Sequence, residues 1–152
     1  MLFRSPGEFG RLEGAPVGDD NGERASRARV AADRWNAVVV LKGANTVVAA
    51  PGGRSVMAPF QNPALATGGT GDVLAGILGS LLSQRMDPFD AACLAVWLHG
   101  VAGEHVRERV GDAGLVAGDL VPEVPRIRRH LAELGRHAAQ GTQRVGFAPR
   151  PS

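Results

Sequence analysis

The sequence contains a single cysteine, Cys93, among its 152 residues. One thiol excludes an internal disulfide bond and a cysteine-based metal cluster, and its apolar neighbours predict a plain buried side chain. No apolar run approaches the length of a membrane span, and residues 1–6 lack the apolar region of a signal peptide. These absences lead us to expect a cytoplasmic protein with no membrane partner.

Lysine and aromatic residues are also scarce. Lys42 is the one lysine beside 16 arginines, which reflects either chance under a codon bias or a position that requires a compact ammonium group. Aromatic residues make up 5%, and the basic residues gather in residues 126–152, where six arginines face one glutamate. The rest of the chain is net acidic. Because no surface pattern combines basic and aromatic residues, we predict no nucleic-acid partner.

What the sequence does contain is typical of one globular domain. Its residues are 44% hydrophobic and 21% charged, which is enough to build one core. Apolar periodicity and turn residues predict strands over residues 37–41, 46–50 and 54–57, and helices over 6–12, 23–35, 73–82, 87–110 and 124–134. Asp87 and Pro88 are expected to start the 87–110 helix, and the arginines of 23–35 are expected to form a solvated face.

These elements favour an α/β layered fold with helices on both faces of the sheet. The run 37–41 is continuous and rich in valine, which is typical of a strand buried on both sides. A buried sheet usually has about five or six strands, so we expect the three found here to be part of a larger sheet. Residues 1–134 form the predicted domain, and residues 135–152 form a predicted disordered basic tail.

The most informative motif is the loop from Gly68 to Asp72, which leads directly into the 73–82 helix. Small residues let a ligand approach the backbone, and the helix start offers free N–H groups to an anion, so the motif predicts a phosphate site. Asp72 is placed to accept a hydroxyl proton during phosphoryl transfer. Neither the Walker A pattern nor the dinucleotide-binding pattern is present. The alternative is a glycine-rich turn in which Asp72 only stabilises the helix, by roughly 0.3–1 kcal/mol.

The motif and its upstream neighbours resemble a known family. Residues 39–46, then Asn62-Pro63 and residues 66–76, closely resemble the ADP/ATP-dependent NAD(P)H-hydrate dehydratases of the ribokinase-like superfamily. Shorter matches lie at residues 6–12, 98–103 and 117–122. The resemblance implies a ribokinase-like α/β domain of which this sequence covers about the second half, so we expect an N-terminally truncated copy.

The resemblance also implies an activity, the ADP- or ATP-dependent dehydration of hydrated NAD(P)H (NADHX or NADPHX) to the reduced cofactor. It implies that Asp72 contacts the hydrated ring as the base, with Asn62 and Glu8 as further substrate contacts. The implied anion hole is Gly68, Gly69 and Thr70. The implied nucleotide-binding positions are Lys42, Gly43, Ala44, Asn45, Thr46 and Gly71. Mg²⁺ is implied as a cofactor, although no metal-ligand cluster shows in the sequence, and a homo-oligomer is expected for the complete domain.

Two residues depart from the family's pattern. Ser5 stands where the family usually has a histidine that helps to hold the hydrated substrate, and Gln61 stands where it usually has a glycine. A ribokinase-like small-molecule kinase and a catalytically silent nucleotide-binding fragment remain alternatives to a dehydratase. His99, beside Trp97 and Leu98 in an apolar helix, is interpreted as a packing residue.

Overall fold

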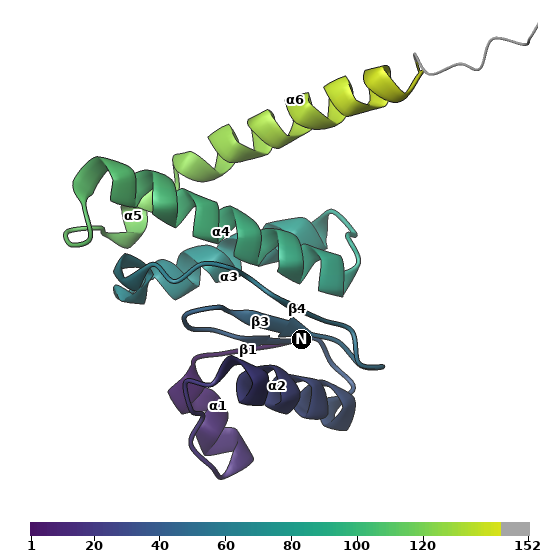
Figure 1. The fold of residues 1–152 in the computed structure, drawn as a ribbon, viewed down its shortest axis with the longest axis vertical. Helices are drawn as coiled ribbons and strands as arrows, with labels where there is room; N and C mark the ends of the chain where they lie inside the picture. The colour runs from purple at the N-terminus through teal and green to yellow at the C-terminus, as the bar shows by residue number, and fades with distance from the viewer. Residues whose placement is uncertain (144–152) are drawn as a thin grey trace, which may run out of the picture.

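The structure, a computed structural model, describes residues 1–143 and is built around a four-stranded sheet (Figure 1). The strands follow one another in chain order: β1 (Leu2–Arg4), β2 (Val39–Leu41), β3 (Val47–Ala49) and β4 (Ser55–Met57). β1 runs parallel to β2, whereas β2, β3 and β4 form an antiparallel meander. The predicted α/β fold is confirmed, and the sheet is mixed.

Helices cover both faces of this sheet. In Figure 1, α1 (Pro6–Glu13) and α2 (Asn21–Trp35) lie below it, while α3 (Thr70–Ser83) and α4 (Pro88–Val110) lie above it. The short α5 (Ala117–Leu120) lies against α3 and α4. The long α6 (Glu123–Gln143) follows on the far side of α4, and its C-terminal part projects away from the body. The molecule is therefore layered as the sequence predicts.

The central strands owe their stability to burial on both sides. Val40 and Val48 face α3 and α4, whereas Val39, Leu41 and Val47 face α1 and α2, and all five side chains are buried. Each face of β2 and β3 thus contributes to a separate hydrophobic cluster, which explains why the sequence shows a continuous apolar run rather than an alternating one. A third cluster joins α4, α5 and α6.

Helix caps fix where the elements begin. The Asp87 carboxylate accepts hydrogen bonds from the backbone N–H groups of Phe89 and Asp90, so α4 starts at Pro88 as predicted. The Asp20 carboxylate accepts from the N–H of Glu23 at 2.7 Å and caps α2 in the same way. Local sequence chemistry therefore determines both boundaries.

The structure contains β1, the short helix η1 (Pro63–Ala66) and α5, which were not predicted, and it extends the last predicted helix. β1 was not predicted, because three residues that end in an arginine carry no periodic signal, and it exists only by pairing with β2. The first nine residues of the predicted tail, 135–143, belong to α6, because the good helix formers Leu134, Arg136 and Ala138 continue the helix. Residues 144–152, for which a disordered tail is predicted, lie outside the described residues. Within residues 1–143, no helix is long and apolar enough to cross a membrane.

Candidate functional site

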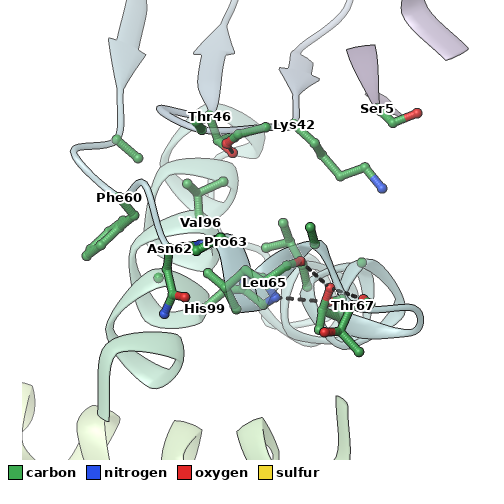
Figure 2. Close-up of a pocket in the computed structure, with 18 of the residues that line it drawn as sticks. Ser5, Lys42, Thr46, Phe60, Asn62, Pro63, Leu65, Thr67, Val96 and His99 are labelled. Atoms are coloured by element: carbon green, nitrogen blue, oxygen red, sulfur yellow. Dashed lines mark hydrogen bonds between the residues drawn. The ribbon is translucent and has the colours of Figure 1, made fainter. Parts of the chain in front are cut away.

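A pocket of about 660 Å³ opens where the carboxyl ends of β1 and β2 face the start of α3 (Figure 2). Most positions singled out in the sequence line it: Lys42, Gly43, Ala44, Thr46, Asn62, Gly68, Gly69, Thr70, Gly71 and Asp72. Ser5, Phe60, Gln61 and His99 line it as well. The structure thus brings together segments that are far apart in the chain. Two predicted site residues, Glu8 and Asn45, lie outside the lining.

The start of α3 forms one wall of the pocket. Gly69 occupies the N-cap position and supplies no side-chain acceptor to the first turn. Asp72 lies in that first turn with its side chain exposed. The N–H groups of Thr70, Asp72 and Val73 bond to carbonyl groups of residues 67–69, which leaves the N–H of Gly71 without a partner among the described residues. That N–H and the positive end of the dipole of this 14-residue helix favour binding of an anion.

The ammonium group of Lys42 extends from the opposite wall toward this helix start (Figure 2). Its Nζ atom lies 2.9 Å from the position that a Cβ atom at Gly71 would occupy, so the absence of a side chain at Gly71 lets the ammonium group come this close. Nζ also lies 4.7 Å from the centre of the Phe3 ring, and no carboxylate of the described chain pairs with it. The Lys42 ammonium group and the positive end of the helix dipole therefore converge on one place, which favours a phosphate group, and Asp72 lies at its edge.

The loop that carries Lys42 is tightly folded. The Thr46 hydroxyl donates to the carbonyl oxygen of Gly43 at 3.0 Å, and the Asn45 N–H donates to the carbonyl oxygen of Phe60 at 2.8 Å. The Asn45 side chain is buried, and its Oδ1 atom accepts from Gln61 at 3.4 Å. Asn45 thus joins this loop to residues 60–61 and does not face the pocket.

Glu8 likewise has a local partner. Its carboxylate accepts from the backbone N–H of Ser5 at 2.8 Å, while the Ser5 hydroxyl accepts from the N–H of Glu8 at 3.3 Å, which together form a capping box at the start of α1. The backbone hydrogen bond from Ser5 lowers the pKa of the Glu8 carboxyl group. The structure therefore places Ser5 in the pocket and uses Glu8 to hold it there.

Asn62 is placed in the lining by its own cap. The side chain is only 7% exposed, and its Oδ1 atom accepts from the N–H of Ala64 at 2.9 Å to start the short helix η1 (Pro63–Ala66). Its Nδ2 atom is buried and has no hydrogen-bond partner in the described part of the chain. An unsatisfied buried donor beside a pocket is a polar group that a ligand can engage after a small rotation.

Two residues in or beside the pocket have contacts that the sequence did not predict. His99 is buried as a packing residue, as interpreted, but it also lines the pocket, and its Nε2 atom lies 2.9 Å from the carbonyl oxygen of Thr70. Burial lowers the pKa of the His99 imidazole, so the neutral ring donates from Nε2 to that oxygen. Nothing in the sequence signals this contact, since the two residues are 29 positions apart.

Arg24 is the second such residue, and here the predicted solvated face of 23–35 is wrong. Its side chain is only 4% exposed and reaches the loop of Lys42. A signal existed: Arg24 shares one helical stripe with the buried Ala28, Ala31 and Ala32. An arginine in line with the alanines of the buried helix face is expected to point toward the protein interior.

The residues present fit a Mg²⁺ ion shared with phosphate groups better than a metal ion held by the protein alone. Asp72 is the one carboxylate in the lining, and the described residues hold no cluster of three metal-ligating side chains. Mg²⁺ in nucleotide sites is usually held by one or two carboxylates together with substrate phosphates. Asp72 and the phosphate groups would therefore share the ion.

Comparison with known proteins agrees with this geometry. Residues 5–126 match the NAD(P)H-hydrate dehydratase family. The chain is 40% identical to the ADP-dependent (S)-NAD(P)H-hydrate dehydratase of Neisseria meningitidis over 134 residues, which are 88% of this chain and 45% of that protein. It is 41% identical to the bifunctional NAD(P)H-hydrate repair enzyme of Moorella thermoacetica over 133 residues, 88% of this chain and 25% of that one.

Solved structures give the same result. The ADP/ATP-dependent NAD(P)H-hydrate dehydratase of Bacillus subtilis, co-crystallized with ATP and Mg²⁺, superposes with a TM-score of 0.79 at 38% identity, covering 85% of this chain and 47% of that one. A ribokinase-like protein of Enterococcus faecalis, 24% identical with a TM-score of 0.66, shares the fold over 84% of this chain and 44% of its own.

The chain spans between a quarter and a half of the length of these relatives. Within that span the match includes the β2 loop, the glycine motif and α4, which are the elements that build the pocket. The chain therefore belongs to the NAD(P)H-hydrate dehydratase family.

Proposed function

We propose that the pocket binds an adenine nucleotide and hydrated NAD(P)H, and that the chain serves the ADP- or ATP-dependent dehydration of NADHX or NADPHX. The observation that carries this proposal is the convergence of the Lys42 ammonium group and the start of α3 on one anion site, with Asp72 at its edge. The names of the Neisseria and Bacillus relatives supply the substrate class. The site lies within residues 1–134.

Each residue has a distinct task in this reaction. The backbone at Gly68, Gly69 and Thr70 and the ammonium group of Lys42 hold the transferring phosphoryl group, whose negative charge they stabilise. Asp72 accepts the proton of the ring hydroxyl as its oxygen attacks phosphorus. The nucleotide leaves as AMP or ADP. Elimination of inorganic phosphate from the ring, with release of a neighbouring ring proton to solvent, then restores the reduced cofactor. Mg²⁺, when bound, neutralises phosphate charge beside Asp72.

The test supplies the purified chain with hydrated NADH and ADP or ATP, and follows recovery of the absorbance band of reduced nicotinamide. Recovery that depends on the nucleotide supports the proposal. A stable phosphorylated product would instead identify a small-molecule kinase. Nucleotide binding without any reaction would identify a silent nucleotide-binding fragment.

The remaining properties follow from the same function. We propose a cytoplasmic location, where both nucleotides are abundant, and a homo-oligomer for the complete domain. Fractionation of cells and the molar mass in solution test these two statements separately.

A further inference from the structure

Arg24 of α2 lies beneath the loop that carries Lys42. Its Nη2 atom donates to the carbonyl oxygen of Lys42 at 3.0 Å, and its Nη1 atom donates to the carbonyl oxygen of Ala44. The loop is shaped around the guanidinium group: Gly43 adopts a φ of +132°, and a Cβ atom there would lie 2.7 Å from Nη2. One side chain thus holds two carbonyl groups of the loop, two residues apart.

A purely structural role explains this arrangement poorly. The guanidinium group is buried, its Nε atom has no hydrogen-bond partner among the described residues, and no carboxylate of those residues forms an ion pair with it. Asp19 exerts only a distant attraction. Burying a charge without an opposite charge is costly, and a neutral side chain could pack the same space at lower cost. The guanidinium charge of Arg24 is therefore better explained by a role in the function of the neighbouring loop than by packing alone.

We infer that Arg24 is a positioning residue for the anion site: it fixes the carbonyl groups of Lys42 and Ala44, and through them it directs the Lys42 ammonium group toward Gly71. Its own charge also adds to the positive potential beneath the site. This inference rests on the proposed nucleotide function for its biological meaning, but the positioning itself can be measured without any nucleotide.

Arginine is required here because of its geometry. The planar guanidinium group presents parallel donors that bridge two carbonyl groups, whereas a lysine ammonium group is a single point charge on a flexible stem. Arg24→Lys keeps the charge and most of the packing but loses the bridge. It therefore separates positioning from charge, and Arg24→Met removes both.

The first measurement uses Lys42 as its own probe, because it is the sole lysine of the chain. Acetylation of its amine by a soluble active ester is followed in the absence of ligand by mass spectrometry of the peptide that contains Lys42, which in Arg24→Lys is resolved from the peptide that contains the new lysine at position 24. We expect the acetylation rate to rise several-fold in Arg24→Lys and Arg24→Met, because the amine is no longer held against Phe3 and Gly71. The control is Arg29→Met, also on α2, whose side chain contacts Ser55 instead.

The second measurement is ADP affinity. We expect Arg24→Lys to weaken ADP binding about tenfold, and this effect to vanish in a Lys42→Met background, since Arg24 acts through Lys42. A folded Arg24→Lys variant with wild-type amine reactivity would overturn the inference, as would an ADP effect that persists undiminished beside Lys42→Met. If the wild type binds no ADP, the proposed function fails, and amine reactivity alone decides the role of Arg24.

Discussion

Asp72 stands apart among the residues that line the pocket, because it is the one carboxylate between an ammonium group and an open helix start. A carboxylate in that place attracts cations and repels phosphate, so it weakens the binding of an anion. A chemical task would explain why a carboxylate is nevertheless present. Proton transfer is such a task, since the group that accepts a hydroxyl proton must lie beside the phosphoryl group.

Asp72→Asn tests that task at the residue scale. We expect nucleotide-dependent recovery of NADH to fall at least 100-fold, with ADP affinity kept within a few-fold, because the change removes a base and leaves the backbone donors in place. The measurements are the initial rate with hydrated NADH and ADP binding by calorimetry. Retained turnover would show that another group is the base.

Individual site residues differ in how far the sequence reveals them. Lys42 and Asp72 could be predicted, because each lies in a contiguous motif with its own chemistry. The role of His99 could not, and for Arg24 the alanine stripe indicates burial but not the partner, since both roles depend on contacts 29 and 18 positions away. A local pattern cannot specify such contacts, and it equally hides that Asn45 turns away from the pocket. By contrast, Ser5 and Glu8 have the spacing of a capping box, so the cap formed by Glu8 could be read from the sequence.

At the scale of elements, α4 positions the segment that carries Asn62. Two glycines on α4 receive large side chains: a Cβ atom at Gly100 would lie 2.1 Å from the Phe60 ring, and one at Gly103 would lie 2.7 Å from Leu65. Both Phe60 and Leu65 line the pocket. The fit between α4 and residues 60–65 thus defines that side of the site.

Gly100→Ala should therefore destabilise the fold. We expect a loss of about 1–3 kcal/mol from overpacking against Phe60, measured by urea unfolding. The matched control is Gly76→Ala on α3, where nothing lies near the new Cβ atom and alanine should add roughly 0.5–1 kcal/mol. Because Phe60→Leu creates space, adding it to Gly100→Ala should recover part of the lost stability. If Gly100→Ala and Gly76→Ala were equally stable, the predicted close fit at Gly100 would be wrong.

α6 is anchored by one carboxylate. Glu123 is 5% exposed, and its Oε1 atom accepts from Nη1 of Arg109 and from Nη1 of Arg126, each at 3.0 Å. Burial acts to raise the pKa of the Glu123 carboxyl group, but the hydrogen bond from Arg109 and the charge of Arg126 outweigh it and lower the pKa. The ionised form therefore stabilises the folded protein.

This lowered pKa gives a defined pH dependence. The stabilisation by Glu123 is complete above the carboxyl pKa of the unfolded chain and is lost as the pH falls through the lower pKa of the folded state. We expect Glu123→Gln to cost about 1 kcal/mol at neutral pH, with a deficit that disappears in acid. Thermal unfolding between neutral and acidic pH measures it, with the exposed Glu108→Gln as control. A loss of stability that does not depend on pH would mean that the ion pairs of Glu123 with Arg109 and Arg126 contribute nothing to the stability of the folded protein.

Helices and strands with a strong local sequence pattern were predicted, whereas elements without such a pattern were missed. The helix starts at Asp20 and Asp87 carry cap residues, and β2 and β3 carry continuous apolar runs, so both kinds appear where predicted. β1, η1 and α5 have four residues or fewer and depend on tertiary contacts. That is why no sequence periodicity marks them.

At the scale of the whole molecule, the anion site couples ligand binding to stability. A ligand that binds only the folded state stabilises it by about 2.7 kcal/mol at a concentration 100 times its Kd. We therefore expect ADP to raise the melting temperature of the wild type, and to raise that of Lys42→Ala much less at equal concentration. Differential scanning fluorimetry measures both melting temperatures. An equal shift in the two proteins would show that Lys42 does not contribute to ADP binding.

The pairing of β1 with β2 has a kinetic consequence. Leu2 lies beside Val39 in this parallel pair, so closing it brings together residues 37 positions apart, whereas β2, β3 and β4 are joined by short connections. Because loop-closure entropy delays contacts between distant residues, we expect the meander to form early in folding and β1 to dock late. Ser5 and Pro6 follow β1 directly and line the pocket. The pocket should thus be among the last parts of the protein to mature during refolding.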